Sequence, residues 1–218
     1  MYNHYETIDG MLFLDLDDIF DPNGEYIDDY KKYQKLESIK IILFRTKKHP
    51  IKIGKDFLRS CPNLTTIDLS HLSNVTSVGN DFLRSCTNLT TIDLSPLSNV
   101  TSIGNNFLSY CLNLTTIDLS PLSNITSISG GFLWNCSNLT IIDLSPLSNV
   151  TFIEVHFLSS CSNLTIIDLS PLSNITSISG GFLSNCSNLQ KPCIQKNCIQ
   201  KTCIQNLVYK QTWIQKLV

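Results

Sequence analysis

The sequence lacks an apolar stretch long enough to cross a membrane as a helix, which takes about 20 residues. The longest early apolar run, MLFL at 11–14, is ended by Asp15. The first ten residues, MYNHYETIDG, also lack the basic and apolar regions of a signal peptide. These absences predict an intracellular location, the host cytoplasm if the source is a virus. The nine cysteines fit a reducing compartment in which thiols stay free.

Charge is scarce in the long central part of the chain. Residues 57–190 carry two basic side chains, Arg59 and Arg84, against seven Asp and Glu. Residues 191–218 carry five lysines and no acidic residue. Five loosely spaced lysines are too few for a nucleic-acid site, so nucleic acid is not expected as a partner.

The sequence also lacks the patterns of known reaction centres. No nucleophile–base pair, phosphate-binding loop or cluster of metal ligands is visible, so we expect neither an enzyme nor a bound cofactor or metal. The acidic residues between 15 and 21 lack the spacing of a calcium-binding EF-hand loop. The four histidines are scattered: His4, His49, His71 and His156.

What the sequence does contain is a repeat with a fixed step of 25 residues. Full copies begin at Phe57, Phe82, Phe107, Phe132 and Phe157, and a partial sixth runs from Phe182 to Leu189. Self-similarity at such a period predicts a solenoid, in which each copy is one coil and neighbouring coils share a core.

Two stretches of each coil have the pattern of strands. Leu64, Ile67 and Leu69 follow L-x-x-I-x-L, in which the last two alternate as in a strand with one buried face. Val75 and Val78 belong to a second β-branched stretch, which predicts a short strand on the opposite wall.

The rest of the coil is predicted as corners and one helical turn. Phe82, Leu83 and Cys86 have the spacing i, i+1, i+4, which one helical turn would place on a single side. Ser-Pro at 95–96 and Gly-Asn at 104–105 indicate corners. The predicted coil is therefore strand, corner, short strand, corner and helical turn.

This pattern resembles leucine-rich repeats of the bacterial surface-antigen (BspA-like) type, which also occur in protists and large DNA viruses. The residues that carry the resemblance are Cys86, Leu89, Ile92, Leu94, Pro96, Val100, Ile103, Gly104 and Phe107. The resemblance covers about 32–190 and implies a leucine-rich-repeat solenoid. It implies stacked coils with a parallel β-sheet on one wall and short strands and single helical turns on the others. The coil is longer than is usual for this type, and Asn106 or Gly131 replaces the usual alanine.

The chain divides into four parts. Residues 1–31 are predicted as an acidic, irregular segment, and 57–190 as the repeats. Residues 32–56 are predicted as an N-terminal capping repeat, in which Ile39 and Ile41 align with Ile67 and Leu69 at a step of 28, and Ile53 aligns with Val78. Residues 191–218 are a basic tail with Cys-Ile-Gln at 193, 198 and 203; a loosely docked or poorly ordered end is expected there.

Stacking turns repeated positions into columns about 4.8 Å apart. The column of cysteines, from Cys61 to Cys186, is predicted to be a row of small buried hydrophobes rather than a redox ladder. The columns that begin at Asn63 and Asn74 are predicted to hydrogen-bond corner backbone from coil to coil.

A face of threonines and aspartates points outward from the predicted main sheet. In leucine-rich repeats this face usually binds partners, so it is the candidate interaction surface. It comprises Thr66, Asp68, Thr91, Asp93, Thr116, Asp118, Asp143 and Asp168. The alternative is a solvated face copied by duplication, which the near-identity of the coils favours. Trp134 is a candidate hot spot or, equally, a corner that tolerates any residue.

The predicted function is a non-catalytic, monomeric repeat scaffold that presents its sheet face to another protein. The resemblance offers an alternative, a surface or secreted adhesin, which cell fractionation separates from the first. A third alternative is an expanded paralogue with no dedicated partner.

Overall fold

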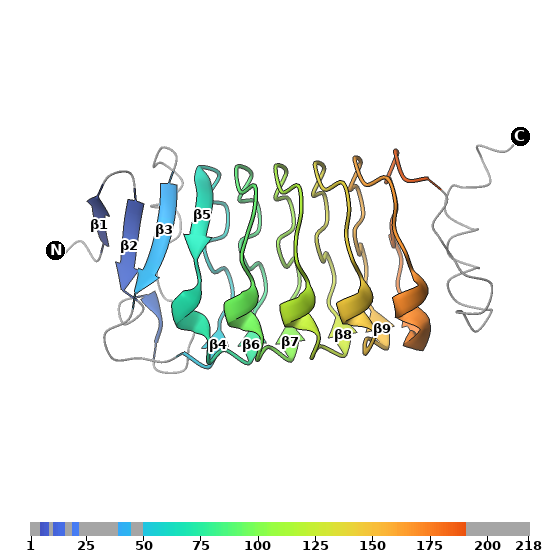
Figure 1. The fold of residues 1–218 in the computed structure, drawn as a ribbon, viewed down its shortest axis with the longest axis horizontal. Helices are drawn as coiled ribbons and strands as arrows, with labels where there is room; N and C mark the ends of the chain where they lie inside the picture. Colours follow the sequence, from blue (N-terminus) through green and yellow to red (C-terminus); the bar gives the residue numbers. More distant parts are fainter. Residues whose placement is uncertain (1–4, 9–10, 16–18, 22–38, 45–49, 191–218) are drawn as a thin grey trace, which may run out of the picture.

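The 25-residue repeat forms a rod of stacked coils in the computed structural model of the chain (Figure 1). The structure describes residues 5–8, 11–15, 19–21, 39–44 and 50–190. The predicted solenoid is confirmed. The predicted basic tail, 191–218, lies outside the described residues, as do parts of the segments 1–31 and 32–56.

The main wall begins as a regular sheet. Strand β5 (Leu64–Asp68) pairs in parallel with β3 (Ile39–Phe44), β3 pairs in parallel with β2 (Met11–Asp15), and β1 (Tyr5–Ile8) pairs antiparallel with β2. Further along the rod the wall is extended chain joined by single bonds between coils. Thr115 N donates to Thr90 O at 3.3 Å, and Thr140 N donates to Thr115 O at 3.3 Å.

The opposite wall consists of two-residue parallel strands, as predicted from the β-branched stretches. One sheet holds β4 (Lys52–Ile53), β6 (Ser77–Val78) and β7 (Ser102–Ile103). A second holds β8 (Ser127–Ile128), β9 (Phe152–Ile153) and β10 (Ser177–Ile178). Between β7 and β8 the hydroxyl of Ser129 donates to Ile103 O at 2.8 Å, so a side chain links the two sheets.

The helical turn of each coil lies at the Ser-Pro-Leu segment, which is Ser-His-Leu in the first coil, where the sequence had indicated a corner. These 3-10 turns are η2 (Ser70–Leu72), η3 (Ser95–Leu97), η4 (Ser120–Leu122), η5 (Ser145–Leu147) and η6 (Ser170–Asn174). Proline suits the first turn of a helix because it needs no amide donor there. The leucine of each turn, such as Leu97, is buried.

The predicted helical turn at Phe82, Leu83 and Cys86 is wrong. Asp81, Leu83 and Ser85 have φ of 61°, 51° and 62°, so left-handed residues alternate with others and no helix forms. Bonds between coils hold this geometry: Leu83 N donates to Phe57 O at 2.9 Å, and Ser85 N donates to Ser109 O at 2.8 Å. Spacing alone could not show it, because the Leu83 and Ser85 amides bond to neighbouring coils, while those of Arg84 and Cys86 bond within the turn.

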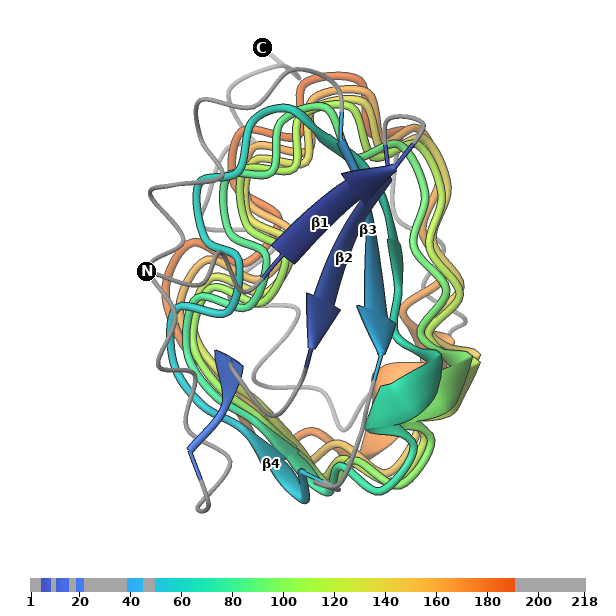
Figure 2. The same ribbon diagram turned by 90° about the vertical axis from the view of Figure 1, so that its left-hand side faces the viewer.

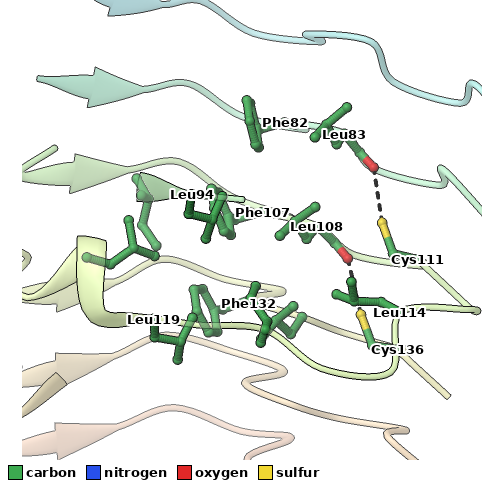
Figure 3. Close-up of a cluster of buried hydrophobic side chains, with 14 of the residues drawn as sticks. Phe82, Leu83, Leu94, Phe107, Leu108, Cys111, Leu114, Leu119, Phe132 and Cys136 are labelled. Carbon is green, nitrogen blue, oxygen red and sulfur yellow. Dashed lines mark hydrogen bonds between the residues drawn. The ribbon is translucent and has the colours of Figure 1, made fainter. Parts of the chain in front are cut away.

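The core is built from columns of identical side chains (Figure 3). The phenylalanine rings stack from coil to coil, with centroids 5.2 Å apart between Phe82 and Phe107 and 5.7 Å apart between Phe107 and Phe132. Beside them run a leucine column and the cysteine column, both buried. Residues of every coil therefore contact the next coil through the same side chains.

The N-terminal segment contributes to the solenoid, which corrects the prediction of an irregular segment. Strands β1 and β2 lie across the N-terminal end of the stack (Figure 2). Leu12 and Leu14 are fully buried, and Phe20 stacks on Phe57 with centroids 5.7 Å apart. These apolar residues cover the first coil, which no preceding coil would otherwise bury.

The register of the capping repeat also differs from the predicted one. Ile41 pairs with Ile67, a step of two residues fewer than predicted, and the register shifts between Ile39 and Lys40. Because the correction is two residues, Ile41 still faces the core, where it is buried. On the other wall Ile53 pairs with Val78 as predicted.

Both asparagine columns link coils, and one of them does so as predicted. Asn99 Nδ2 donates to Ser73 O at 2.9 Å, and Asn124 Nδ2 donates to Ser98 O at 3.1 Å. The other column forms a side-chain ladder instead, in which Asn138 Nδ2 donates to Asn113 Oδ1 at 3.1 Å.

Candidate functional site

All eight residues of the candidate surface are exposed on the outer face of the main wall. The alternation places Ile117 in the core and Thr116 and Asp118 outside, and every coil repeats it. The structure therefore brings the threonine and aspartate columns together on one face. That this face binds a partner stays a prediction.

Two isoleucines interrupt the threonine column. Ile141 and Ile166 occupy the positions that hold Thr66, Thr91 and Thr116 in the earlier coils. They are 64% and 60% exposed and lie side by side, joined by a parallel β-bridge. Sequence reasoning missed them, although the pairs Ile-Ile at 141–142 and 166–167 stand where other coils have Thr-Ile.

Each aspartate of the face also has a local structural role. Asp118 Oδ1 accepts a hydrogen bond from Ser120 N at 2.8 Å, and the equivalent bond recurs at Asp93 and Asp143. Hydrogen bonds from the Ser120 side chain and backbone lower the pKa of Asp118 below its ordinary value. Each carboxylate thus caps its 3-10 turn from the position before the N-cap leucine, as an Asx turn. This structural role is a reason for the aspartate to be kept in every coil.

Replacing one cap should destabilise the chain measurably. We expect Asp93→Ala to lower the free energy of unfolding by about 1 kcal/mol, the usual net contribution of one hydrogen bond. Asp93→Asn keeps an oxygen acceptor for Ser95 N and should lose much less. Urea denaturation measures both, with Thr91→Ala as the control on the same strand. Equal losses for the Ala and Asn variants would show that the charge, not the cap, stabilises the turn.

Trp134 lies on the turn that carries Phe132 and Leu133, away from the threonine–aspartate face. Its ring stacks on His156 with centroids 4.7 Å apart and meets Tyr110 edge-on at 5.0 Å. Trp134 is only half-exposed, because its neighbours in the adjacent coils cover it. The candidate hot spot and the predicted surface are therefore two separate features of the coil.

The two arginines of the repeats form ion pairs outside the main wall. Arg59 contacts Asp56 at 2.9 Å and Asp81 at 3.5 Å, and Arg84 contacts Asp81 at 2.9 Å. These residues belong to the same turn segment as the phenylalanine column. The aspartates of the main wall keep their charge uncompensated by either arginine.

The cysteine column is chemically quiet. Cys111 Sγ donates to Leu83 O at 3.3 Å, and Cys136 Sγ donates to Leu108 O at 3.2 Å (Figure 3). Burial is the main cause that raises the pKa of these thiols, and it raises that of Cys161 to about 12. A thiol of this kind is not a nucleophile at neutral pH. The predicted burial of the column is confirmed, and its hydrogen bonds were not foreseen.

The described residues contain neither a cluster of metal ligands nor a membrane-spanning helix. No group of three or more His, Cys, Asp or Glu side chains there could hold a metal ion. Across 5–8, 11–15, 19–21, 39–44 and 50–190, no helix is long and apolar enough to span a membrane.

Comparison with solved structures finds the same fold in one bacterial protein, TpLRR, and lower-scoring matches in two others. The leucine-rich repeat protein TpLRR of T. pallidum is 16% identical over 86% of this chain and 87% of that chain, with a TM-score of 0.53. A leucine-rich repeat protein of Eubacterium ventriosum is 18% identical, with a TM-score of 0.38, and covers 74% of this chain and 56% of that one. The functional domain of InlJ from Listeria monocytogenes is 17% identical, with a TM-score of 0.27, over 84% and 55%.

Comparison with family models identifies the repeat. No curated protein matches the chain significantly. The model of the BspA-type leucine-rich repeat region matches 20–140 and 98–211, with six copies. The chain therefore belongs to the BspA-type leucine-rich repeat family.

Proposed function

We propose that the chain is a non-catalytic scaffold that binds another protein through the outer face of its main wall. The observation that carries the proposal is the exposed pair Ile141 and Ile166. Adjacent exposed isoleucines on a face otherwise made of polar side chains gain free energy when a partner covers them.

The chemistry around the pair suggests what the partner presents. Asp143 and Asp168 lie two residues beyond Ile141 and Ile166, on the same face. The arginines of the repeats are paired with Asp56 and Asp81 on another part of the coil. A protein surface with apolar side chains beside Lys or Arg would complement this arrangement.

Replacing the two isoleucines by the residue of the earlier coils tests the proposal. We expect the Ile141→Thr, Ile166→Thr double variant to weaken the Kd for the partner about tenfold or more, a loss of about 1.4 kcal/mol. The partner is first recovered by affinity capture with the wild-type chain, then purified, and its Kd is measured by titration calorimetry.

A matched control removes an exposed apolar side chain from the other wall. Phe152 is 36% exposed in β9, where the neighbouring strands carry Ser127 and Ser177. Phe152→Ser should leave the Kd unchanged, and Trp134→Ala should do the same. If either weakens binding while the isoleucine double variant does not, the partner binds elsewhere on the rod.

A further inference from the structure

We propose that residues 191–218 of the same chain dock on the outer face of the main wall, over Ile141 and Ile166. This docking is intramolecular, so it does not depend on the protein partner of the proposed function. Its consequence, that the tail competes with a partner for this face, rests on the function proposed above.

The face and the tail have matching patterns. Ile141 and Asp143 point outward with buried Ile142 between them, and Ile166 and Asp168 do the same around Ile167. The tail contains the triplet Ile-Gln-Lys at 194–196 and again at 199–201. In an extended segment, residues two apart share a side, so each triplet presents an isoleucine and a lysine together. One triplet at a time can then place its isoleucine against Ile141 or Ile166 and its lysine beside the aspartate, because the step of five residues turns the other triplet to the opposite side.

The charges of the two parts are complementary. The main wall carries five aspartates in one column: Asp68, Asp93, Asp118, Asp143 and Asp168. All five are exposed, and the two arginines of the repeats contact other carboxylates. The tail carries five lysines and no acidic residue. Attraction between opposite charges favours the outer face of this wall over the less charged parts of the coil.

The described chain ends beside the proposed docking position. Gln190 N donates to Thr165 O at 2.9 Å, so the tail starts from the main wall, next to the residue that precedes Ile166. Adjacent coils are about 4.8 Å apart, and a few extended residues at about 3.3 Å each bridge that distance. Attachment to the same chain also gives the tail an effective concentration of about millimolar order at the face.

Carbodiimide cross-linking of the full chain tests the docking directly, because it joins a lysine amine to a carboxylate in contact with it. The chain is treated at low concentration, and the monomer is digested and analysed by mass spectrometry. We expect Lys196 or Lys201 joined to Asp143 or Asp168, with yields about tenfold above those to Asp68 or Asp93, equivalent to about 1.4 kcal/mol.

Two variants separate apolar docking from charge alone. Ile141→Thr with Ile166→Thr should lower the yields at Asp143 and Asp168 about tenfold. Ile141→Val with Ile166→Val keeps branched apolar side chains and should preserve them. The threonine variant carries the residues of the earlier coils at exposed positions, so the fold should be retained.

Several results would overturn the proposal. Yields spread evenly over the five aspartates would mean that charge alone holds the tail. Products found only between two copies would make a second chain the occupant, and no tail-to-wall product would place the tail elsewhere, for instance as a further coil. Cross-linking requires no partner, so a failure of the proposed function leaves these products unchanged, and the two proposals fail separately.

Discussion

Raising the pH from 8 to 10 should lower the free energy of unfolding by about 7 kcal/mol through the cysteine column alone. Five thiols with raised pKa values contribute: Cys86, Cys111, Cys136, Cys161 and Cys186. An unfolded thiol loses its proton near 9.0, its ordinary value, whereas the pKa of folded Cys186 is about 11 and that of Cys161 about 12. At pH 10 the unfolded state therefore binds fewer protons than the folded state, and the equilibrium shifts toward unfolding.

The sign and the window follow from this difference. The contribution of each thiol is fully present below about pH 9, because both states are then protonated, and it is lost as the pH rises toward the folded pKa. One pH unit above the unfolded pKa costs about 1.4 kcal/mol for each thiol. Urea denaturation at several pH values between 7.5 and 10, in the presence of a reductant, measures the loss.

A variant with fewer thiols separates the column from tyrosines and lysines, which also titrate at alkaline pH. Cys111→Ala with Cys136→Ala removes two of the five groups. This variant should be less stable than the wild type at pH 8. Between pH 8 and pH 10, however, its free energy of unfolding should fall by about 4 kcal/mol rather than about 7 kcal/mol. An undiminished drop in this variant would assign the alkaline loss to other groups.

The repeat made most of the fold predictable. Leu64, Ile67 and Leu69 recur at the same positions in coil after coil, so their alternation could not be an accident of one segment. Phe107 and Cys111 were predictable as core residues for the same reason, and both are fully buried. Each of them packs against the residue at the same position of the adjacent coils.

Bonds between coils explain where the prediction of local structure failed. Leucine disfavours positive φ, yet Leu108 has a φ of 53° because its N–H donates to Phe82 O of the preceding coil at 3.0 Å. Asn106, Gly131 and Asn135 are residue types that favour positive φ at neighbouring positions of the turn, but the leucine between them gives no such signal. The bulge between Ile39 and Lys40 is a similar case, since register depends on the neighbouring strand.

The candidate site was predicted in position but not in composition. The outward alternation of Thr116 and Asp118 follows from strand geometry, and the structure shows it. The aspartates were predicted as the site because they recur in every coil. The exposed apolar pair, Ile141 and Ile166, stands where the sequence departs from the repeat. The departures from the repeat, rather than its constant residues, therefore mark the exposed apolar part of this face.

Phe107→Ala should lower the free energy of unfolding by about 3–5 kcal/mol, the usual cost of emptying a buried phenylalanine site. Phe107 is fully buried, and its ring stacks on Phe82 and Phe132 in the two adjacent coils. One truncation therefore weakens two interfaces between coils. Phe152→Ala, which removes a ring that is 36% exposed in β9, is the matched control and should cost less than about 1 kcal/mol.

The same variant should reduce the cooperativity of unfolding, because a solenoid is coupled only through contacts between adjacent coils. With the ring stack interrupted at Phe107, the N-terminal and C-terminal coils remain joined by the leucine and cysteine columns and by backbone bonds such as Leu108 N to Phe82 O, which is a weaker interface than the intact one. We expect a smaller dependence of the unfolding free energy on urea concentration, or two separate transitions. A single transition with an unchanged slope and a loss no larger than that of Phe152→Ala would show that the phenylalanine column does not couple the coils.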